Sequence, residues 1–272
     1  MIIVPPKARP KDLRNTEGIT LVRQPDHAAL SAHVVSQWQR PVGFSNALWN
    51  GLLEAILHHD DGWIQTEIDG LLDKNGRPRD FQHMPLVDHI EIWRRSIALG
   101  LQRSELVGTL IAGHARWLHT PARGTGESRR PPQERKQLAD FLAELDTATL
   151  GAAHRLESIA DTKALDAARR LLSFADGLGL ILLGAIDVRQ WPEEIPVEDS
   201  LCRPTLDIHE DFRNVHMTPW PFVTNKLRFK VAAQHLSTPH YAAPLEFQEA
   251  LETTPAIRLG WELRAGKSGF TG

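Results

Sequence analysis

Residues 171–186 read LLSFADGLGLILLGAI, and Asp176 is the only charged residue among them. This apolar run predicts a buried helix, which the surrounding pattern extends over residues 162–186. An ionised carboxylate inside such a helix is destabilising by on the order of several kcal/mol unless a cation lies beside it. Asp176 therefore needs either a salt bridge, for example to Arg169 or Arg170, or a metal ion.

Two histidines lie on the apolar faces of other predicted helices. His27 faces inward from a helix over residues 26–38, and His114 lies in the middle of the apolar stripe of a helix over residues 104–119. A buried histidine is either a hydrogen-bonded core residue or a metal ligand. His119 falls off the stripe, and we expect it to lie in solvent.

A third imidazole ends the apolar stretch ALWNGLLEAILHH (residues 47–59), which the turn Asp60-Asp61-Gly62 follows. Alone, His59 and Asp60 could simply form a polar helix end, but neighbouring side chains at a helix C-terminus splay and can both reach one ion. Buried imidazoles and carboxylates on separate helices need a partner that offsets their lost hydration, and a metal ion is the usual one. The sequence therefore predicts a metal site formed by His27, His59, Asp60 and Asp176, with His114 as a fifth candidate ligand.

The chain is predicted to be mainly α, as a helical bundle with a small C-terminal β-containing appendage. We place the helical metal-binding domain at residues 1–194 and the β-rich appendage, packed on it, at residues 195–272. Prolines become frequent after Gln190, and the expected elements there are strands at 227–236 and 256–263 with a short helix at 245–252 between them. An early strand, GITLVRQ (residues 18–24), could pair with these strands. The stretch TPARGTGESRRPPQ (residues 120–133) is typical of a loop.

Composition excludes several classes of protein. The 272 residues carry a net charge near −3, which favours neither a nucleic-acid polymer nor an anionic membrane as partner. The sequence has no long apolar span, and a single cysteine, Cys202, excludes an internal disulfide framework and indicates a reducing compartment. We expect a bacterial, cytoplasmic protein that acts on a small molecule. Its thirteen histidines fit metal chemistry but are equally compatible with scattered surface imidazoles.

The order His27, His59-Asp60, Asp176, with histidines between, resembles the H…HD…D pattern of the HD-domain superfamily of metal-dependent phosphohydrolases, including its local form HDDGW. The run QPDHAALSAHV (residues 24–34), followed by HHDDGW and GRP, also resembles an uncharacterised bacterial family known only as a domain of unknown function. No substrate motif of nucleotidases, cyclic-dinucleotide phosphodiesterases or guanosine tetraphosphate hydrolases accompanies the pattern.

The resemblance implies an all-helical bundle in which His27, His59, Asp60 and Asp176 bind one metal ion. In members with two ions, Asp60 would bridge them, and histidines between the HD pair and the last Asp would bind the second. His114 and one of His83 or His89 match those positions in order, although His83 and His89 are as compatible with a place at the surface.

Mixed imidazole and carboxylate ligands suit one or two divalent ions of Mn, Fe, Co, Ni or Zn better than Ca²⁺. Such an ion lowers the pKa of a bound water to roughly 7 and supplies hydroxide at neutral pH. Asp61 could orient that water or accept its proton, or it could merely cap the helix turn. A phosphorylated substrate also needs cations, for which Arg116 and Arg77 are the candidates, together with Arg94 and Arg95.

Three functions remain open at this point. The leading hypothesis is a metal-dependent hydrolase of a small phosphoester or nucleotide. The second is a di-iron oxygenase of the inositol-oxygenase type, in which six ligands hold two ions and one Asp bridges them. The third is a non-catalytic metal-binding or regulatory protein.

Overall fold

Helix α7 (Thr162–Leu182) is the central element of the fold. In the computed structural model every residue of this helix from Leu171 to Leu182 is buried. The Asp161 carboxylate caps its first turn by accepting a hydrogen bond from the Ala164 amide (2.8 Å). The residues that the structure describes are 1–69, 72–120, 130–210 and 212–266.

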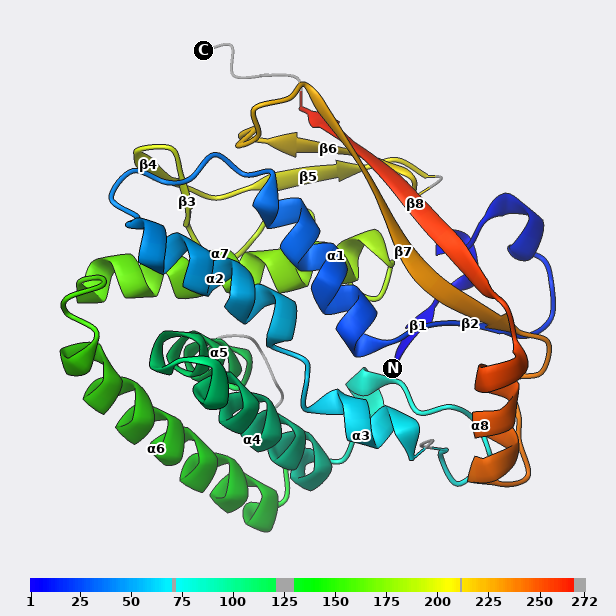
Figure 1. Cartoon of the computed structure of the whole chain (residues 1–272). Helices are drawn as coiled ribbons and strands as arrows, with labels where there is room; N and C mark the ends of the chain where they lie inside the picture. The colour runs from blue at the N-terminus through cyan, green and yellow to red at the C-terminus, as the bar shows by residue number, and fades with distance from the viewer. Residues whose placement is uncertain (70–71, 121–129, 211, 267–272) are drawn as a thin grey trace.

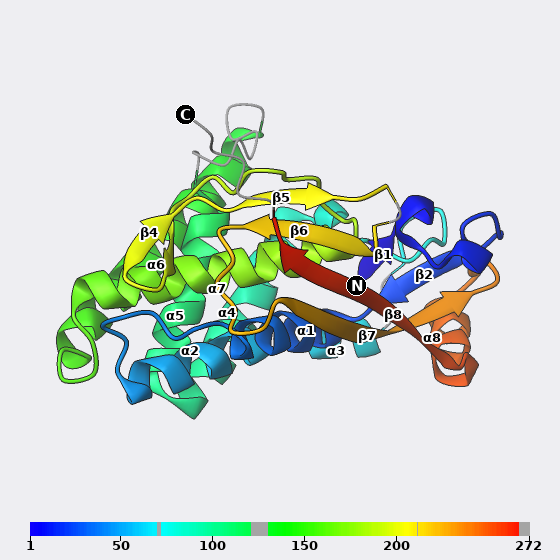
Figure 2. The same cartoon turned by 90° about the horizontal axis from the view of Figure 1, so that it is seen from above.

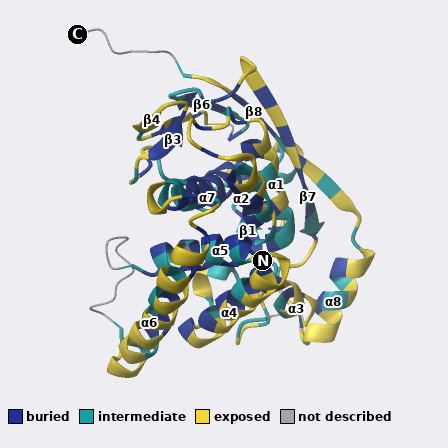
Figure 3. Cartoon of the chain, turned by 60° about the vertical axis from the view of Figure 1, so that its left-hand side comes forward, coloured by how far each residue is buried: buried dark blue, intermediate teal, exposed yellow. Residues whose placement is uncertain are grey.

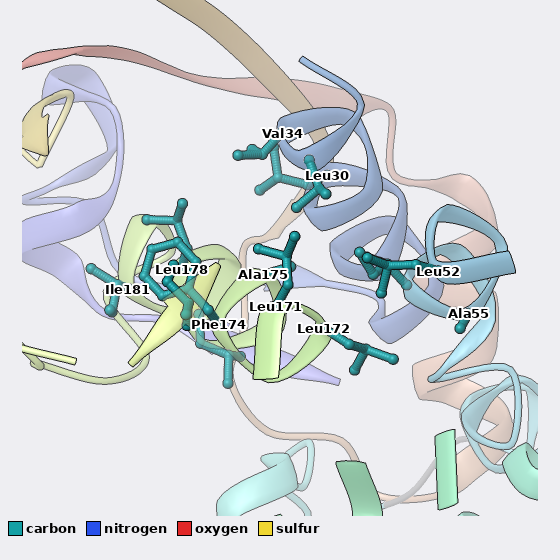
Figure 4. Packing of buried hydrophobic residues seen from close by; sticks show 14 of the residues in the cluster. Leu30, Val34, Leu52, Ala55, Leu171, Leu172, Phe174, Ala175, Leu178 and Ile181 are labelled. Atoms are coloured by element: carbon teal, nitrogen blue, oxygen red, sulfur yellow. The ribbon is translucent and has the colours of Figure 1, made fainter. Parts of the chain in front are cut away.

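Three helices pack directly on α7, namely α1 (Gln24–Ser36), α2 (Asn46–His58) and α5 (Glu105–Leu118). Figure 4 shows the apolar side chains of α7 packed toward those of α1 and α2, with Ala175 facing Leu30 and Leu172 on the side of Leu52. Each leucine buried in this way stabilises the fold by about 2 kcal/mol. The remaining helices are α3 (Trp63–Ile68), α4 (Leu86–Arg103), α6 (Pro132–Arg155) and α8 (Pro244–Thr253). Figure 3 shows α7 mostly buried and much of α6 exposed.

A six-stranded mixed sheet lies beside the helices (Figure 1). Its strand order is β1-β2-β7-β8-β6-β5, in which only the β6–β8 pair is parallel. The strands are β1 (Ile2–Val4), β2 (Ile19–Val22), β5 (Thr205–Ile208), β6 (Asn214–Thr218), β7 (Lys226–Leu236) and β8 (Ala256–Ala265). A separate two-stranded sheet, β3 (Ile195–Val197) and β4 (Ser200–Cys202), packs on α7 through β3.

Strand β7 joins the sheet to the helical layer. Leu227, Phe229 and Val231 are buried on one face of β7, while the residues between them are exposed. The strand packs against α1, and the Phe229 ring lies edge-on to the His33 ring at 5.3 Å. Seen from above, β7 crosses the helices beside α1 (Figure 2). The sheet therefore covers the helix that carries His27.

The expectation of a mainly α protein with a small β-containing appendage was wrong, and so was the all-helical bundle that the resemblance implied. The sheet is a substantial layer, and it takes strands from both ends of the chain. The proposed pairing of the early strand is confirmed, because Ile19 lies opposite Leu236 in the β2–β7 ladder. Strands at 227–236 and 256–263 and the helix between them are also confirmed. The other strands have only three to five residues, too few for a periodic pattern to reveal them.

Most of the predicted loop 120–133 lies outside the described residues, which omit 121–129. Its last two residues already belong to α6, which begins at Pro132. Among the described residues, no helix combines the length and the apolar character that crossing a membrane requires.

Candidate metal centre

Five side chains from four parts of the chain converge at the junction of α1, α2, α5 and α7. All five are buried. They are His27 on α1, His59 and Asp60 at the end of α2, His114 on α5, and Asp176 on α7. They form two overlapping groups whose ligand atoms lie within 4.8 Å of one another, one with His27, His59 and Asp60, the other with His59, His114 and Asp176. These residues could hold a metal ion.

The Asp176 carboxylate lies at the centre of the cluster. Its Oδ1 accepts a hydrogen bond from His27 Nε2 (2.9 Å) and lies 3.6 Å from His59 Nε2, while its Oδ2 lies 3.5 Å from His114 Nε2. His59 Nε2 is also 3.3 Å from Asp60 Oδ2. Atoms that bind one ion at about 2.1 Å lie roughly 3 to 4 Å apart, so these separations fit a shared ion.

Two of the imidazoles are oriented by hydrogen bonds on their outer nitrogens. His59 Nδ1 donates to the Ile56 carbonyl oxygen (2.7 Å), and His114 Nδ1 lies 2.9 Å from the Ser173 hydroxyl. Because a carbonyl can only accept, His59 carries a proton on Nδ1, and its Nε2 faces the Asp60 and Asp176 carboxylates. Such outer hydrogen bonds fix the tautomer and direction of metal-binding histidines.

A glycine allows His27 to reach Asp176. A Cβ at Gly179 on α7 would lie 2.6 Å from His27 Cε1 and 2.6 Å from Ser31 Oγ, closer than carbon atoms come without displacement. Helices α1 and α7 can therefore pack with the His27 ring between them only because residue 179 has no side chain.

Burial and charge act in opposite directions on the cluster. Burial by itself would raise the pKa of Asp176, but the neighbouring imidazoles of His114, His27 and His59 hold it well below its usual range. Burial would lower the pKa of His59, but the Asp60 and Asp176 carboxylates raise it well above its usual value. Burial lowers the pKa of His114 in spite of Asp176. Without an ion, protons must therefore supply the positive charge that the carboxylates need.

A cavity of ≈ 260 Å³ reaches Asp60 and Asp176. Three aromatic side chains, Trp63, Phe81 and Trp93, form part of its wall. Its polar wall includes His89, His119 and Arg130. The carboxylates at the centre of the cluster are thus accessible to a small molecule from one side.

His89 and His119 lie together in this wall. Their ring centroids are 5.4 Å apart, and neither belongs to the two groups of candidate ligands. Burial, followed by the charges of His119 and Arg130, lowers the pKa of His89 to about 4. The expectation that His119 lies in solvent was wrong: the residue is buried, and its Nδ1 donates to the Ala115 carbonyl oxygen (2.7 Å). We expected one apolar stripe on this helix to be buried and the rest to be exposed. That expectation failed because α5 packs against α2, α4, α6 and α7 and is buried around most of its circumference.

The structure does not bring the predicted catalytic residue Asp61 to the cavity. Its carboxylate accepts a hydrogen bond from His58 Nδ1 (2.9 Å) and lies 3.5 Å from Arg103, and neither partner lines the cavity. His83, the alternative to His89, lines a different cavity of ≈ 830 Å³.

The predicted substrate-binding arginines also lie elsewhere. Arg116 pairs with Asp146 and lines a separate cavity of ≈ 650 Å³, and Arg77 lines the ≈ 830 Å³ cavity together with His83. Arg94 pairs with Glu91 and Glu144 at the surface, while Arg95 donates to the Gly62 carbonyl oxygen (3.2 Å) and to Thr66. Sequence reasoning missed Arg130, because it ends a stretch rich in Gly, Pro and Arg that is typical of a solvated loop.

A family model described as "Protein of unknown function (DUF3891)" matches residues 13–238. No curated protein and no solved structure matches the chain. The matched range contains all five converging side chains and the residues of the cavity wall that carry charge.

Proposed function

The chain belongs to the DUF3891 family of proteins of unknown function, and we propose that it is a metal-dependent hydrolase of a small phosphoester or nucleotide. One observation carries the proposal. The Nε2 atoms of His59 and His114 have no hydrogen-bond partner among the described residues, yet they face carboxylate oxygens at 3.3, 3.5 and 3.6 Å. These separations are too long for good hydrogen bonds and suit a cation between the two kinds of donor.

The donor set fits a divalent transition metal, because three imidazoles and two carboxylates suit Mn, Fe, Co, Ni or Zn better than Ca²⁺. His27, His59, Asp60, His114 and Asp176 would hold it. Such an ion supplies hydroxide at neutral pH by lowering the pKa of a bound water to roughly 7. The order of the ligands along the chain resembles that of HD-domain hydrolases, and the reaction class is taken from that resemblance.

The residues around the cluster supply orientation and access. Ile56 and Ser173 hold the two imidazoles with Nε2 toward the carboxylates. The aromatic wall limits the water around a bound substrate, which strengthens electrostatic interactions there. A cavity that reaches the carboxylates favours a catalytic site over a purely structural one, since structural sites are closed by protein ligands.

The distribution of ligands favours one ion over two. A second ion beside Asp60 would need His89, which lies outside both candidate groups. The charge of Arg130 acts on the His89 ring and opposes another cation there. The oxygenase alternative requires two ions, so this arrangement favours the hydrolase.

Two measurements on Asp60→Asn test the proposal. Elemental mass spectrometry of protein purified without a chelating tag should find about one transition-metal ion per wild-type chain. Asp60→Asn keeps the shape of the side chain but removes its charge, so we expect metal affinity and turnover of phosphoesters to fall at least about 100-fold.

Asp69→Asn is the matched control, because Asp69 is exposed and accepts a hydrogen bond from Gln65. It should keep wild-type metal content and activity. Wild-type protein without metal, and without thermal stabilisation by Mn²⁺, Co²⁺, Ni²⁺ or Zn²⁺, would refute the metal site. Metal-dependent oxygen consumption on a polyol, with no phosphoester turnover, would replace the hydrolase by the oxygenase.

A further inference from the structure

Arg130 is the one permanently charged cation among the described residues that line the cavity beside the cluster. Its Nη1 lies 3.3 Å from Glu134 Oε2, at the start of α6. Its Nε is buried and has no hydrogen-bond partner among the described residues. A buried donor without a partner is destabilising by about 1–3 kcal/mol, more for a charged group, so an acceptor that reached this guanidinium group would be stabilised.

Glu134 pairs with Arg130 but is not among the described residues that line the cavity, and no other acidic residue outside the candidate metal centre lines it. Burial lowers the pKa of both His89 and His119, and the charge of Arg130 contributes to both shifts. The two imidazoles are therefore neutral at pH 7 and add no positive charge to that of Arg130. The two acidic residues in the cavity wall, Asp60 and Asp176, belong to the metal centre, and a bound divalent ion would offset their charges.

We propose that Arg130 binds the phosphoryl group of the substrate in this cavity. Guanidinium groups bind phosphate oxygens through two parallel N–H donors, and a phosphate monoester carries close to two negative charges at neutral pH. A single bound divalent ion would provide one centre of positive charge for the phosphoryl group, and Arg130 would provide a second. The inference rests on the proposed function and assigns its substrate as a small phosphomonoester.

The rest of the wall indicates the body of such a substrate. Trp63, Trp93 and Phe81 provide apolar, flat surfaces on the cavity, so the group esterified to phosphate would be flat or apolar rather than a highly hydroxylated chain. The volume of ≈ 260 Å³ suits a single small metabolite and not a polymer.

The test is the affinity of the metal-loaded protein for inorganic phosphate, measured by isothermal titration calorimetry. Arg130→Ala removes a charge-assisted pair of hydrogen bonds, so phosphate should bind about 10- to 100-fold more weakly. Arg130→Lys keeps the charge but not the paired donors and should give an intermediate affinity. Arg135→Ala is the matched control, since Arg135 is an exposed arginine one turn into α6 and does not line the cavity.

Metal content should stay near one ion per chain in all four proteins, because Arg130 is not a ligand. Equal phosphate affinity in wild type, Arg130→Lys and Arg130→Ala would overturn the inference, and so would an equal loss in Arg135→Ala. The binding experiment is independent of turnover. A protein that binds phosphate through Arg130 but hydrolyses no phosphoester would contradict the hydrolase alone, whereas an active enzyme with unchanged binding in Arg130→Ala would contradict this inference alone.

Discussion

The substitution Gly179→Ala separates the stability of the fold from the integrity of the metal centre. The added Cβ would lie 2.6 Å from His27 Cε1 and 2.8 Å from His27 Nδ1. The His27 ring, fully buried between α1 and α7, would have to turn or move with its helix. We expect the metal centre to lose a ligand while the helix itself remains formed.

The magnitude follows from two opposing effects. Alanine is favoured over glycine inside a helix by about 0.8–1.0 kcal/mol. Overpacking in a well-packed core is destabilising by about 1–3 kcal/mol. The free energy of unfolding of the metal-free Gly179→Ala protein should therefore fall by about 2 kcal/mol at most. Metal affinity should fall at least about 10- to 100-fold, the range seen when the support of a single ligand is lost.

Two further glycines provide controls for the two effects. A Cβ at Gly151 in α6 would meet only Arg155, at 3.4 Å, so Gly151→Ala should raise the free energy of unfolding by up to about 1 kcal/mol without changing metal affinity. A Cβ at Gly100 in α4 would lie 2.8 Å from Ile111 Cδ1, so Gly100→Ala should overpack the core without touching His27.

Urea unfolding of the metal-free proteins, followed by circular dichroism, measures the stabilities, and calorimetric titration with Mn²⁺ or Zn²⁺ measures the affinities. Wild-type metal affinity in Gly179→Ala would refute the reasoning. An equal loss of affinity in Gly100→Ala would also refute it, because general overpacking would then account for the effect.

Two other predictions concern the residues around the cavity. Because burial, then the charge of His119, lowers the pKa of His89 to about 4, the unfolded chain binds more protons between about pH 4 and 6.5, and the free energy of unfolding rises with pH across that window. The difference between 6.5 and about 4 limits the contribution to about 3 kcal/mol, and urea unfolding at pH 5 and pH 7.5 should show a smaller pH dependence in His89→Gln. Asp61→Asn should keep wild-type metal content by elemental analysis, because that carboxylate pairs with His58 and Arg103. Loss of the ion in this variant would show that Asp61 contributes to metal binding.

Local sequence signals indicated two of the five residues in the cluster. Asp176 and His114 each interrupt an apolar helical face, and such an interruption has a physical consequence that can be read without a structure. The pair His59-Asp60 is less distinctive, because polar residues commonly end helices. Its place beside Asp176 depends on how α2 packs on α7, which no local pattern specifies.

The cavity wall could not be predicted in the same way. Arg130 is far from His89 in sequence, and its neighbours in the chain are prolines, glycine and charged residues. Arg130 lies just before α6, and the packing of α6 on α4 and α5 is a tertiary contact that the local sequence does not indicate. Arg116 shows the opposite case, since its nearness to His114 in sequence suggested a shared site, but successive positions on a helix face different directions. Arg116 faces Asp146 on α6 instead.

The sheet helps to hold the candidate metal ligands together. Helix α1 is buried along seven of its thirteen residues, and it contacts α2 and α7 as well as β7. Without β7, the side of α1 that carries His33 would lose its contact with Phe229. Fewer contacts would then hold α1 in the position that places His27 beside Gly179 and Asp176. The family match ends at residue 238, just after the last residue of β7, Leu236. A candidate ligand on α1 requires α1 to be held from both sides, so β7 and the helices that carry the candidate ligands pack as one unit.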